Sequence, residues 1–290
     1  MSGSAPGEQG NARAIGVFDS GLGGLTVVHE LRRCLPRESI VYLGDTARVP
    51  YGTRSAATVV RYARGCARLL VQRNIKALVI ACNTASAVAL DILQAELDLP
   101  VIGVVGPGAR AAVTAADQAE REQGRPVRIG VMGTLSTIRS GAYAREVARL
   151  SSRHEVHSQA APLLVPLVEE GWLEGDVPRL AIERYLSTLL KPDVGVLVLG
   201  CTHYPLLKSM IAEVALRLLG RPIRVVDSAE ATASAVHELL EQRAWHTPNP
   251  EAALQLLVTD LPDSFQASAT RFLGDVVGSA QAVDIMPADG

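Results

Sequence analysis

Short apolar runs alternate with longer amphipathic stretches along most of the chain. The apolar runs are rich in Val and Ile, most end in Gly, Asp, Ser or Cys, and we predict them to be buried strands: 14–20, 39–45, 76–82, 100–105, 127–133, 194–201 and 222–228. The stretches between them, such as 25–35 and 56–73, have helical periodicity. Strands that alternate with helices indicate parallel sheets covered on both faces. Ligands bind beyond the carboxyl ends of such strands, so chemistry is expected in the residues that follow each run.

A repeat within this pattern predicts two related lobes. The run IGVFDS, which begins at Ile15, is similar to IGVMGT, which begins at Ile129. ALVIACNT places Cys82 at one strand end and VLVLGCTH places Cys201 at another, in the same order and at nearly the same separation. We therefore expect an α/β protein of two pseudo-symmetric lobes, each a mainly parallel sheet flanked by helices, with the active site in the cleft between them. The expected division is a disordered leader at 1–13, a first lobe at 14–107 completed by 222–290, and a second lobe at 108–221.

Composition and charge exclude several classes of protein. Of the 290 residues 48% are hydrophobic, which is more apolar side chain than disordered chains carry. The net charge is −2, so no nucleic-acid partner is expected. The apolar runs are far shorter than the ~20 residues that cross a bilayer, and residues 1–14 lack the apolar segment of a secretory signal. We expect a soluble, cytoplasmic protein with no membrane partner.

The four cysteines include no CxxC pair and are too sparse for a disulfide framework. Cys34 and Cys66 lie on helical stripes of apolar residues and are expected in the core. Cys82 and Cys201 follow buried strands and precede turns that contain threonine, where the amino ends of helices lower thiol pKa values. Either one could be a small apolar core residue, but their matched placement favours a shared catalytic role.

Two thiols on facing lobes suit one kind of reaction. If a substrate carbon lies between them, one cysteine as thiolate removes a proton from one face of the carbon. The opposite thiol then donates a proton to the other face, which inverts the configuration at that carbon. Because an ordinary thiol is mostly protonated at neutral pH, each cysteine needs a neighbour that can hold its proton. The candidates are Asp19, which ends the first strand, and His203, two residues after Cys201. Asp19 could also cap a helix, and His203 could be a turn residue.

Two further motifs have more than one interpretation. The glycine-rich turn 19–24 offers backbone N–H groups to an anionic ligand, for which a carboxylate is a natural guest. Asp45 ends the next strand, as the ribose-binding acid of a dinucleotide site would, so a nucleotide stays open as a ligand. His154 and His157 are accompanied by no carboxylate or cysteine cluster, and we expect both on a solvated surface rather than at a metal.

In combination, these motifs resemble those of the glutamate racemases, in the cofactor-independent aspartate/glutamate racemase superfamily. The resemblance runs from about Ile15 to Ser228 and rests on FDSGLGG at 18–24, Gly44-Asp45 with Pro50-Tyr51-Gly52, ACNTAS at 81–86 and GCTHYP at 200–205. It implies two similar lobes that close on free glutamate, without pyridoxal phosphate, metal or nucleotide as cofactor. It also implies a bacterial cell in which D-glutamate feeds peptidoglycan synthesis, and a homodimer is a further expectation.

The resemblance assigns roles to single residues. Cys82 and Cys201 would be the catalytic acid/bases, with Cys82 acting on the D enantiomer and Cys201 on the L enantiomer. Asp19 and His203 match positions that assist the thiols. Glu169 in PLVEEG matches a third assisting acid, although the adjacent Glu170 makes that match ambiguous. The positions that match substrate-binding residues are Asp19, Ser20, Tyr51, Gly52, Asn83, Thr84, Thr202 and His203.

The residues by themselves leave other functions open. An aspartate racemase would use the same chemistry on a side chain one methylene shorter, a difference that a pocket discriminates by only ~1–3 kcal/mol. A cysteine hydrolase with Cys201 as nucleophile and His203 as base would leave Cys82 unexplained. A nucleotide-dependent oxidoreductase built on the glycine turn and a non-catalytic amino-acid binder are the remaining alternatives.

Overall fold

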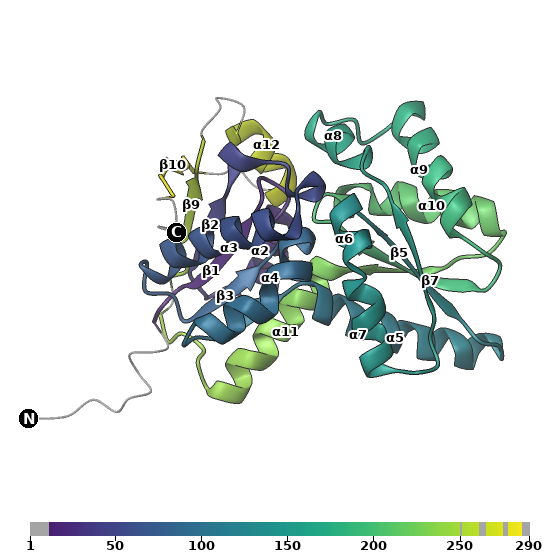
Figure 1. The fold of residues 1–290 in the computed structure, drawn as a ribbon, viewed down its shortest axis with the longest axis horizontal. Helices are drawn as coiled ribbons and strands as arrows, with labels where there is room; N and C mark the ends of the chain where they lie inside the picture. The colour runs from purple at the N-terminus through teal and green to yellow at the C-terminus, as the bar shows by residue number, and fades with distance from the viewer. Residues whose placement is uncertain (1–11, 250, 261–264, 275–277, 286–290) are drawn as a thin grey trace, which may run out of the picture.

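The computed structural model describes residues 12–249, 251–260, 265–274 and 278–285. Two lobes lie side by side, each built on its own parallel sheet, and α11 runs below the first lobe from the junction with the second (Figure 1). The expected two-lobed α/β fold is therefore confirmed. The predicted leader, 1–13, lies outside the described residues except at its last two positions.

The first sheet has six strands in the order β10-β9-β2-β1-β3-β4, and every pairing is parallel. All residues of the central strand β1 are buried because helices cover both faces, as its continuous apolar sequence requires. The strands are β1 (Ile15–Asp19), β2 (Ile40–Gly44), β3 (Ala77–Ile80), β4 (Val101–Gly103), β9 (Leu254–Val258) and β10 (Gln281–Ala282). The flanking helices are α2 (Leu25–Cys34), α3 (Ala56–Val71), α4 (Asn83–Glu96) and α12 (Phe265–Leu273), with short 3-10 turns at Thr46–Arg48 and Tyr51–Thr53.

The second sheet has four parallel strands in the order β6-β5-β7-β8. They are β5 (Arg128–Gly133), β6 (Val156–Ala160), β7 (Val194–Gly200) and β8 (Arg224–Asp227). The helices of this lobe are α5 (Val105–Gln123), α6 (Leu135–Ser140), α7 (Ala142–Leu150), α8 (Leu164–Glu169), α9 (Asp176–Leu189) and α10 (Lys208–Leu219), with a 3-10 turn at Tyr204–Leu207. None of the helices in the described part of the chain is both long and apolar enough to span a membrane.

The internal repeat seen in the sequence is present in the topology. The order β2-β1-β3-β4 of the first sheet recurs as β6-β5-β7-β8 in the second, so β1 corresponds to β5 and β3 to β7. Cys82 lies two residues after the end of β3 and Cys201 directly follows β7, so the two cysteines occupy equivalent places in the two lobes. The carboxyl ends of both sheets face the same cleft, because both cysteines line one cavity.

Several expectations about the chain's course are corrected. Strand β8 pairs with β7 in the second sheet, so the chain does not return to the first lobe at 222 but through α11 (Ser228–Arg243), which packs against α2 and α5. Strand β6 escaped prediction because its sequence, VHSQA, is polar and only half-buried at a sheet edge. His154 is buried rather than solvated, with its Nε2 2.9 Å from Asp117 Oδ1, because that carboxylate satisfies the ring. Cys66 is buried in the core, while Cys34 is only partly buried against it.

A buried ion pair fixes the segment that follows α11. The Lys76 ammonium and the Glu38 carboxylate pair with almost no exposure to solvent. Lys76 Nζ also donates to the Trp245 carbonyl at 2.8 Å, and Glu38 Oε1 accepts the Thr247 N–H at 2.8 Å. The pair therefore holds residues 245–247 against the first sheet, immediately before the chain enters β9.

Removal of one partner of this pair should destabilise the fold strongly. In Lys76→Met, the Glu38 carboxylate stays buried without its counter-charge, so we expect the free energy of unfolding to fall by about 3–5 kcal/mol in denaturant titrations. Glu96→Gln, which breaks the exposed pair with Arg64, is the control and should cost less than about 1 kcal/mol. Equal losses in the two variants would contradict a structural role for the buried pair.

Candidate active site between the lobes

A cavity of about 310 Å³ lies between the carboxyl ends of the two sheets. This volume is at the lower end of the range for small-molecule sites, about 300–1,000 Å³. The expected site residues that line it are Ser20, Tyr51, Gly52, Cys82, Asn83, Thr84, Glu169, Cys201, Thr202 and His203. Asp19 lies behind this wall and is fully buried. A larger groove of about 660 Å³ between α4, α5, α7 and α11 contains neither Cys82 nor Cys201.

Cys82 lies at the amino end of α4, where its thiol is 3.7 Å from the Ser20 hydroxyl. Its side chain is almost fully buried. Burial, together with the charge of the nearby Asp19 carboxylate, raises the pKa of Cys82 to about 12, although the Ala85 N–H acts to lower it. The helix terminus therefore does not dominate, and the lowered thiol pKa expected from the sequence is wrong at this position. We therefore expect the Cys82 thiol to be protonated at neutral pH.

Cys201 has a different neighbour. Its sulfur lies 3.8 Å from His203 Nδ1, and His203 Nε2 lies 3.0 Å from Glu169 Oε1. Burial disfavours the charged imidazolium, but the hydrogen bonds with Cys201 and Glu169 outweigh it and raise the pKa of His203 to about 10. These contacts form a chain from the thiol through the imidazole to a half-exposed carboxylate, so His203 can take the Cys201 proton and remain charged.

Asp19 is the last residue of β1, an inner strand of the first sheet. Its Oδ2 accepts the Gly21 N–H at 2.9 Å, and its Oδ1 has no hydrogen-bond partner among the described residues. Burial raises the pKa of Asp19, whereas the positive charge of His203 acts to lower it. Asp19 does not cap α2, whose amino end at Gly24 has no side-chain cap. The turn therefore holds one oxygen of this carboxyl group, and the group lies near enough to Cys82 and His203 to affect the pKa of the first and to be affected by the charge of the second.

Polar groups from both lobes form the rest of the wall. Asn83 Oδ1 accepts the Tyr143 hydroxyl at 2.7 Å, while Asn83 Nδ2 is buried and has no partner in the described part of the chain. The Thr84 hydroxyl lies 2.9 Å from that of Thr134, which connects α4 with the second lobe. The Tyr51 hydroxyl donates to Asp45, so Tyr51 does not offer that group to a ligand. The Asp45 carboxylate is also held by Arg48, which accounts for this acid without a nucleotide ribose.

The glycines of the 19–24 turn allow the lobes to meet. A Cβ atom at Gly23 would lie within 3.0 Å of both the Thr202 hydroxyl and His203 Nδ1, and one at Gly24 would overlap Asp19. Thr26, in the first turn of α2, donates to the Thr202 carbonyl at 3.0 Å. The absence of side chains at these positions brings the turn after β1 directly against the turn after β7.

Some contributors carried no recognisable signal in the sequence. Val165 and Pro166 of α8 are apolar, yet they form part of the cavity wall. Arg271 of α12 donates to the carbonyl of Val168 at 3.1 Å and to that of Glu169 at 2.8 Å, so the C-terminal helix holds the end of α8 from the opposite lobe. Figure 1 shows α12 above the first sheet, beside α8. Such contacts depend on the tertiary arrangement and not on a motif.

A side chain at Gly23 should disturb the site more than the fold. In Gly23→Ala, the new methyl group would push Thr202 and His203 away from Cys201. Displacements of about 1 Å at a catalytic group can cost about 100-fold in rate, and we expect a loss of that order in kcat/KM. Gly278→Ala is the matched control, because its Cβ would meet no atom of the described residues within 4 Å. Wild-type kinetics in Gly23→Ala would show that the two turns do not constrain the chemistry.

Known proteins are similar in sequence to almost the whole length of this chain. Residues 15–236 match the family described as Asp/Glu/Hydantoin racemase. A glutamate racemase of Geobacter metallireducens is 48% identical over 274 residues, covering 94% of this chain and 97% of the relative. A glutamate racemase of Aquifex aeolicus is 43% identical over 263 residues, covering 91% and 95%.

Solved structures share the fold as well. A glutamate racemase isoform from Bacillus anthracis matches with a TM-score of 0.87 at 39% identity, covering 95% of this chain and 98% of the other. Glutamate racemase from Francisella tularensis, solved in complex with D-glutamate, matches with a TM-score of 0.85 at 34% identity and the same coverage. With two cysteines from equivalent strand ends facing one small cavity, this chain is a racemase and belongs to the Asp/Glu/Hydantoin racemase family.

Proposed function

We propose that the chain interconverts L-glutamate and D-glutamate by proton abstraction at one face of Cα and proton donation at the other. The observation that carries this proposal is the placement of Cys82 and Cys201 on opposite lobes of one cavity of about 310 Å³. A negative charge on Cys201 disfavours one on Cys82, since Cys201 contributes to the raised pKa of Cys82. A single thiolate with a single protonated thiol is the arrangement that two-base inversion requires.

Cys201 is the base for the L enantiomer in this proposal. His203 Nδ1 takes the thiol proton, and the Glu169 carboxylate stabilises the resulting imidazolium through Nε2. The raised pKa of His203, about 10, supports a charged ring at neutral pH. The Cys201 thiolate then removes the Cα proton, and the pair of electrons left on Cα is delocalised into the adjacent carboxylate.

Cys82 is the acid in the same direction. Its raised pKa, about 12, keeps the thiol protonated, so it can donate to the opposite face of the carbanion. Starting from D-glutamate the roles reverse, and Asp19 and Ser20 are the groups near enough to Cys82 to accept or share its proton. The two sulfurs therefore have equivalent positions but unequal environments.

The rest of the wall supports an amino-acid substrate. The free N–H group of Asn83 and the amino end of α4 suit a carboxylate, while Ser20, Thr84 and Thr202 offer hydroxyl groups to the carboxylates and the ammonium. The names of the relatives favour glutamate over aspartate. In line with the family resemblance, we propose a role in supplying D-glutamate to peptidoglycan synthesis in the cytoplasm, by a reaction that uses no pyridoxal phosphate, metal or nucleotide. A homodimer stays a prediction.

Loss of either thiol should abolish racemisation. We expect Cys82→Ala and Cys201→Ala each to lower the rate by about 10²–10⁴-fold or more, because each removes one acid/base group. The measurement follows optical rotation and loss of the Cα proton with L-glutamate in D₂O, and then with L-aspartate. Cys34→Ala is the matched control and should retain the wild-type rate. Near wild-type turnover in Cys82→Ala or Cys201→Ala would refute the two-base mechanism. Faster turnover of aspartate than of glutamate would keep the mechanism but make aspartate the substrate.

Glu169 should act through His203 on Cys201 alone. Because the two enantiomers have equal free energy, Glu169→Gln must lower kcat/KM equally in both directions, and we expect about a tenfold loss. The distinctive result is a larger primary isotope effect with Cα-deuterated L-glutamate than with the D enantiomer, since abstraction by Cys201 becomes slower. Glu170→Gln is the control for the neighbouring carboxylate. An isotope effect that rises only with D-glutamate would assign Glu169 to the other thiol.

A further inference from the structure

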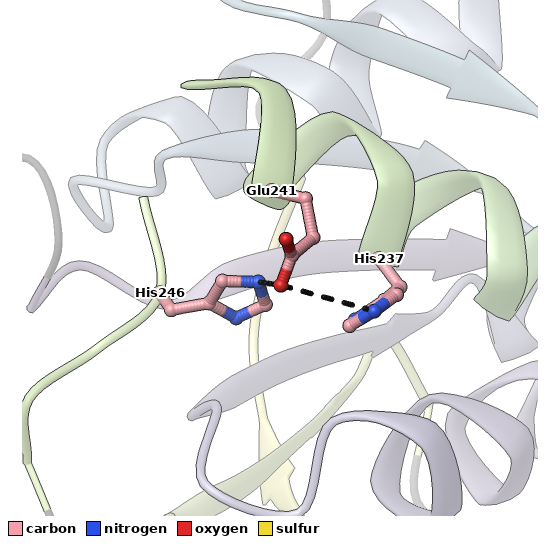
Figure 2. Close-up of side chains that lie close together, drawn as sticks. All are labelled: His237, Glu241 and His246. Carbon is pink, nitrogen blue, oxygen red and sulfur yellow. Dashed lines mark ion pairs between the residues drawn. The ribbon is translucent and has the colours of Figure 1, made fainter. Parts of the chain in front are cut away.

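A second cluster of ionisable side chains lies away from the racemase cavity, at the end of α11. His237 Nε2 and His246 Nε2 lie 4.0 and 3.1 Å from the same Glu241 oxygen, Oε1. One ligand atom from each residue lies within 4.8 Å of the others (Figure 2). None of the three residues lines the cavity between the lobes. The proposed racemisation therefore makes no use of this cluster.

Local backbone structure explains why the three side chains meet. His237 and Glu241 are four residues apart on α11 and share one face of the helix. The helix then ends at Ala244, which has a positive φ of 53°, and the Trp245 N–H donates back to the Leu240 carbonyl at 2.9 Å. This reversal turns the chain onto the helix face and brings His246 beside Glu241.

Each imidazole has one ring nitrogen that makes no hydrogen bond to the described residues. His237 Nδ1 has no hydrogen-bond partner among the described residues, and the approach of His246 Nε2 to Glu241 lacks the alignment of a hydrogen bond. In a tetrahedral site with bonds of about 2.0–2.2 Å, ligand atoms are separated by roughly 3.4 Å. The observed separations of 3.1 and 4.0 Å from Glu241 Oε1 bracket this value.

An outer carboxylate lies behind one of the rings. His246 Nδ1 is 3.9 Å from Glu38 Oε1, and Glu38 is itself held by Lys76 and the Thr247 N–H. Metal-bound histidines commonly direct their second ring nitrogen at a carboxylate, which fixes the tautomer and the ring orientation. The buried ion pair thus holds the backbone on both sides of His246 and places an acceptor near its ring.

A comparable cluster in the second lobe lacks these properties. Asp117, Glu120 and His154 also lie close together. There the guanidinium of Arg153 already pairs with both carboxylates, and His154 contacts Asp117 through Nε2 and the Val127 carbonyl through Nδ1. A cation would have to displace an arginine and two ring contacts, so the cluster on α11 is the better ligand set.

We propose that His237, Glu241 and His246 bind one divalent transition-metal ion of the zinc class. Two imidazoles and one carboxylate suit Zn²⁺, Ni²⁺ or Co²⁺, and water completes the coordination, since the side chains are half-exposed. The ion would join the end of α11 to the segment that leads into β9. Because α11 packs against helices of both lobes, binding should stabilise the folded chain without entering the chemistry.

The test must separate this cluster from the active-site thiols, because thiolates are themselves zinc ligands. In a Cys82→Ser/Cys201→Ser background we expect calorimetric titration with ZnCl₂ to give one equivalent of bound metal and the melting temperature to rise by a few degrees. His237→Ala and His246→Ala should each weaken binding by at least about tenfold, and Glu241→Gln should weaken it less. His157→Ala and Glu238→Gln, which alter residues outside the cluster, are the matched controls and should bind as the background does.

Co²⁺ provides a readout of ligand type. A site of two imidazoles and a carboxylate gives weak visible bands and no thiolate charge-transfer band, and the bands should vanish in the His237→Ala/His246→Ala variant. Unchanged affinity in that double variant would overturn the proposal, as would no saturable binding in the background protein. In the protein that keeps Cys82 and Cys201, His237→Ala should leave racemase activity unchanged. Failure of the metal proposal would therefore not count against the proposed function.

Discussion

The site depends on how closely the turn after β1 approaches the turn after β7. These turns come from different lobes, yet Gly23 leaves no room for a side chain between them, and Thr26 donates across to the Thr202 carbonyl at 3.0 Å. This contact fixes the second-lobe turn that carries Cys201 and His203 relative to the first sheet. A catalytic pair divided between two lobes needs such a constraint, because small displacements of either lobe would separate the thiols from a shared carbon.

The two halves of the fold repeat one another, but their electrostatic environments differ. Cys82 lies near Asp19 and Ser20, in surroundings that keep its thiol protonated. Cys201 instead contacts His203, whose second nitrogen reaches Glu169. The repeat thus supplies equivalent positions for the sulfurs, and the neighbouring side chains distinguish them. In the proposed mechanism this difference makes Cys201 the base and Cys82 the acid for L-glutamate, and the two roles reverse for D-glutamate.

Connections between the lobes come from parts of the chain distant from the cysteine motifs. Helix α11 follows β8 of the second sheet and packs against α2 of the first lobe. Helix α12 packs against α2 as well, and its Arg271 holds the carbonyls at the end of α8. The buried Lys76–Glu38 pair anchors the segment between these helices. The assembly around the cleft therefore includes the C-terminal quarter of the chain as well as the repeated halves.

The sequence alone predicted most of the strands and the repeat, because short apolar runs that alternate with helical stretches are typical of a parallel sheet covered on both faces. A cysteine that follows such a strand is expected at the edge of the sheet where ligands bind. It predicted Cys82, Cys201 and His203 at one site, and the structure brings them there. Only the tertiary structure decided the place of β8, the burial of His154 and the raised pKa of Cys82. Each depends on partners distant in sequence and on desolvation, which a linear pattern does not encode.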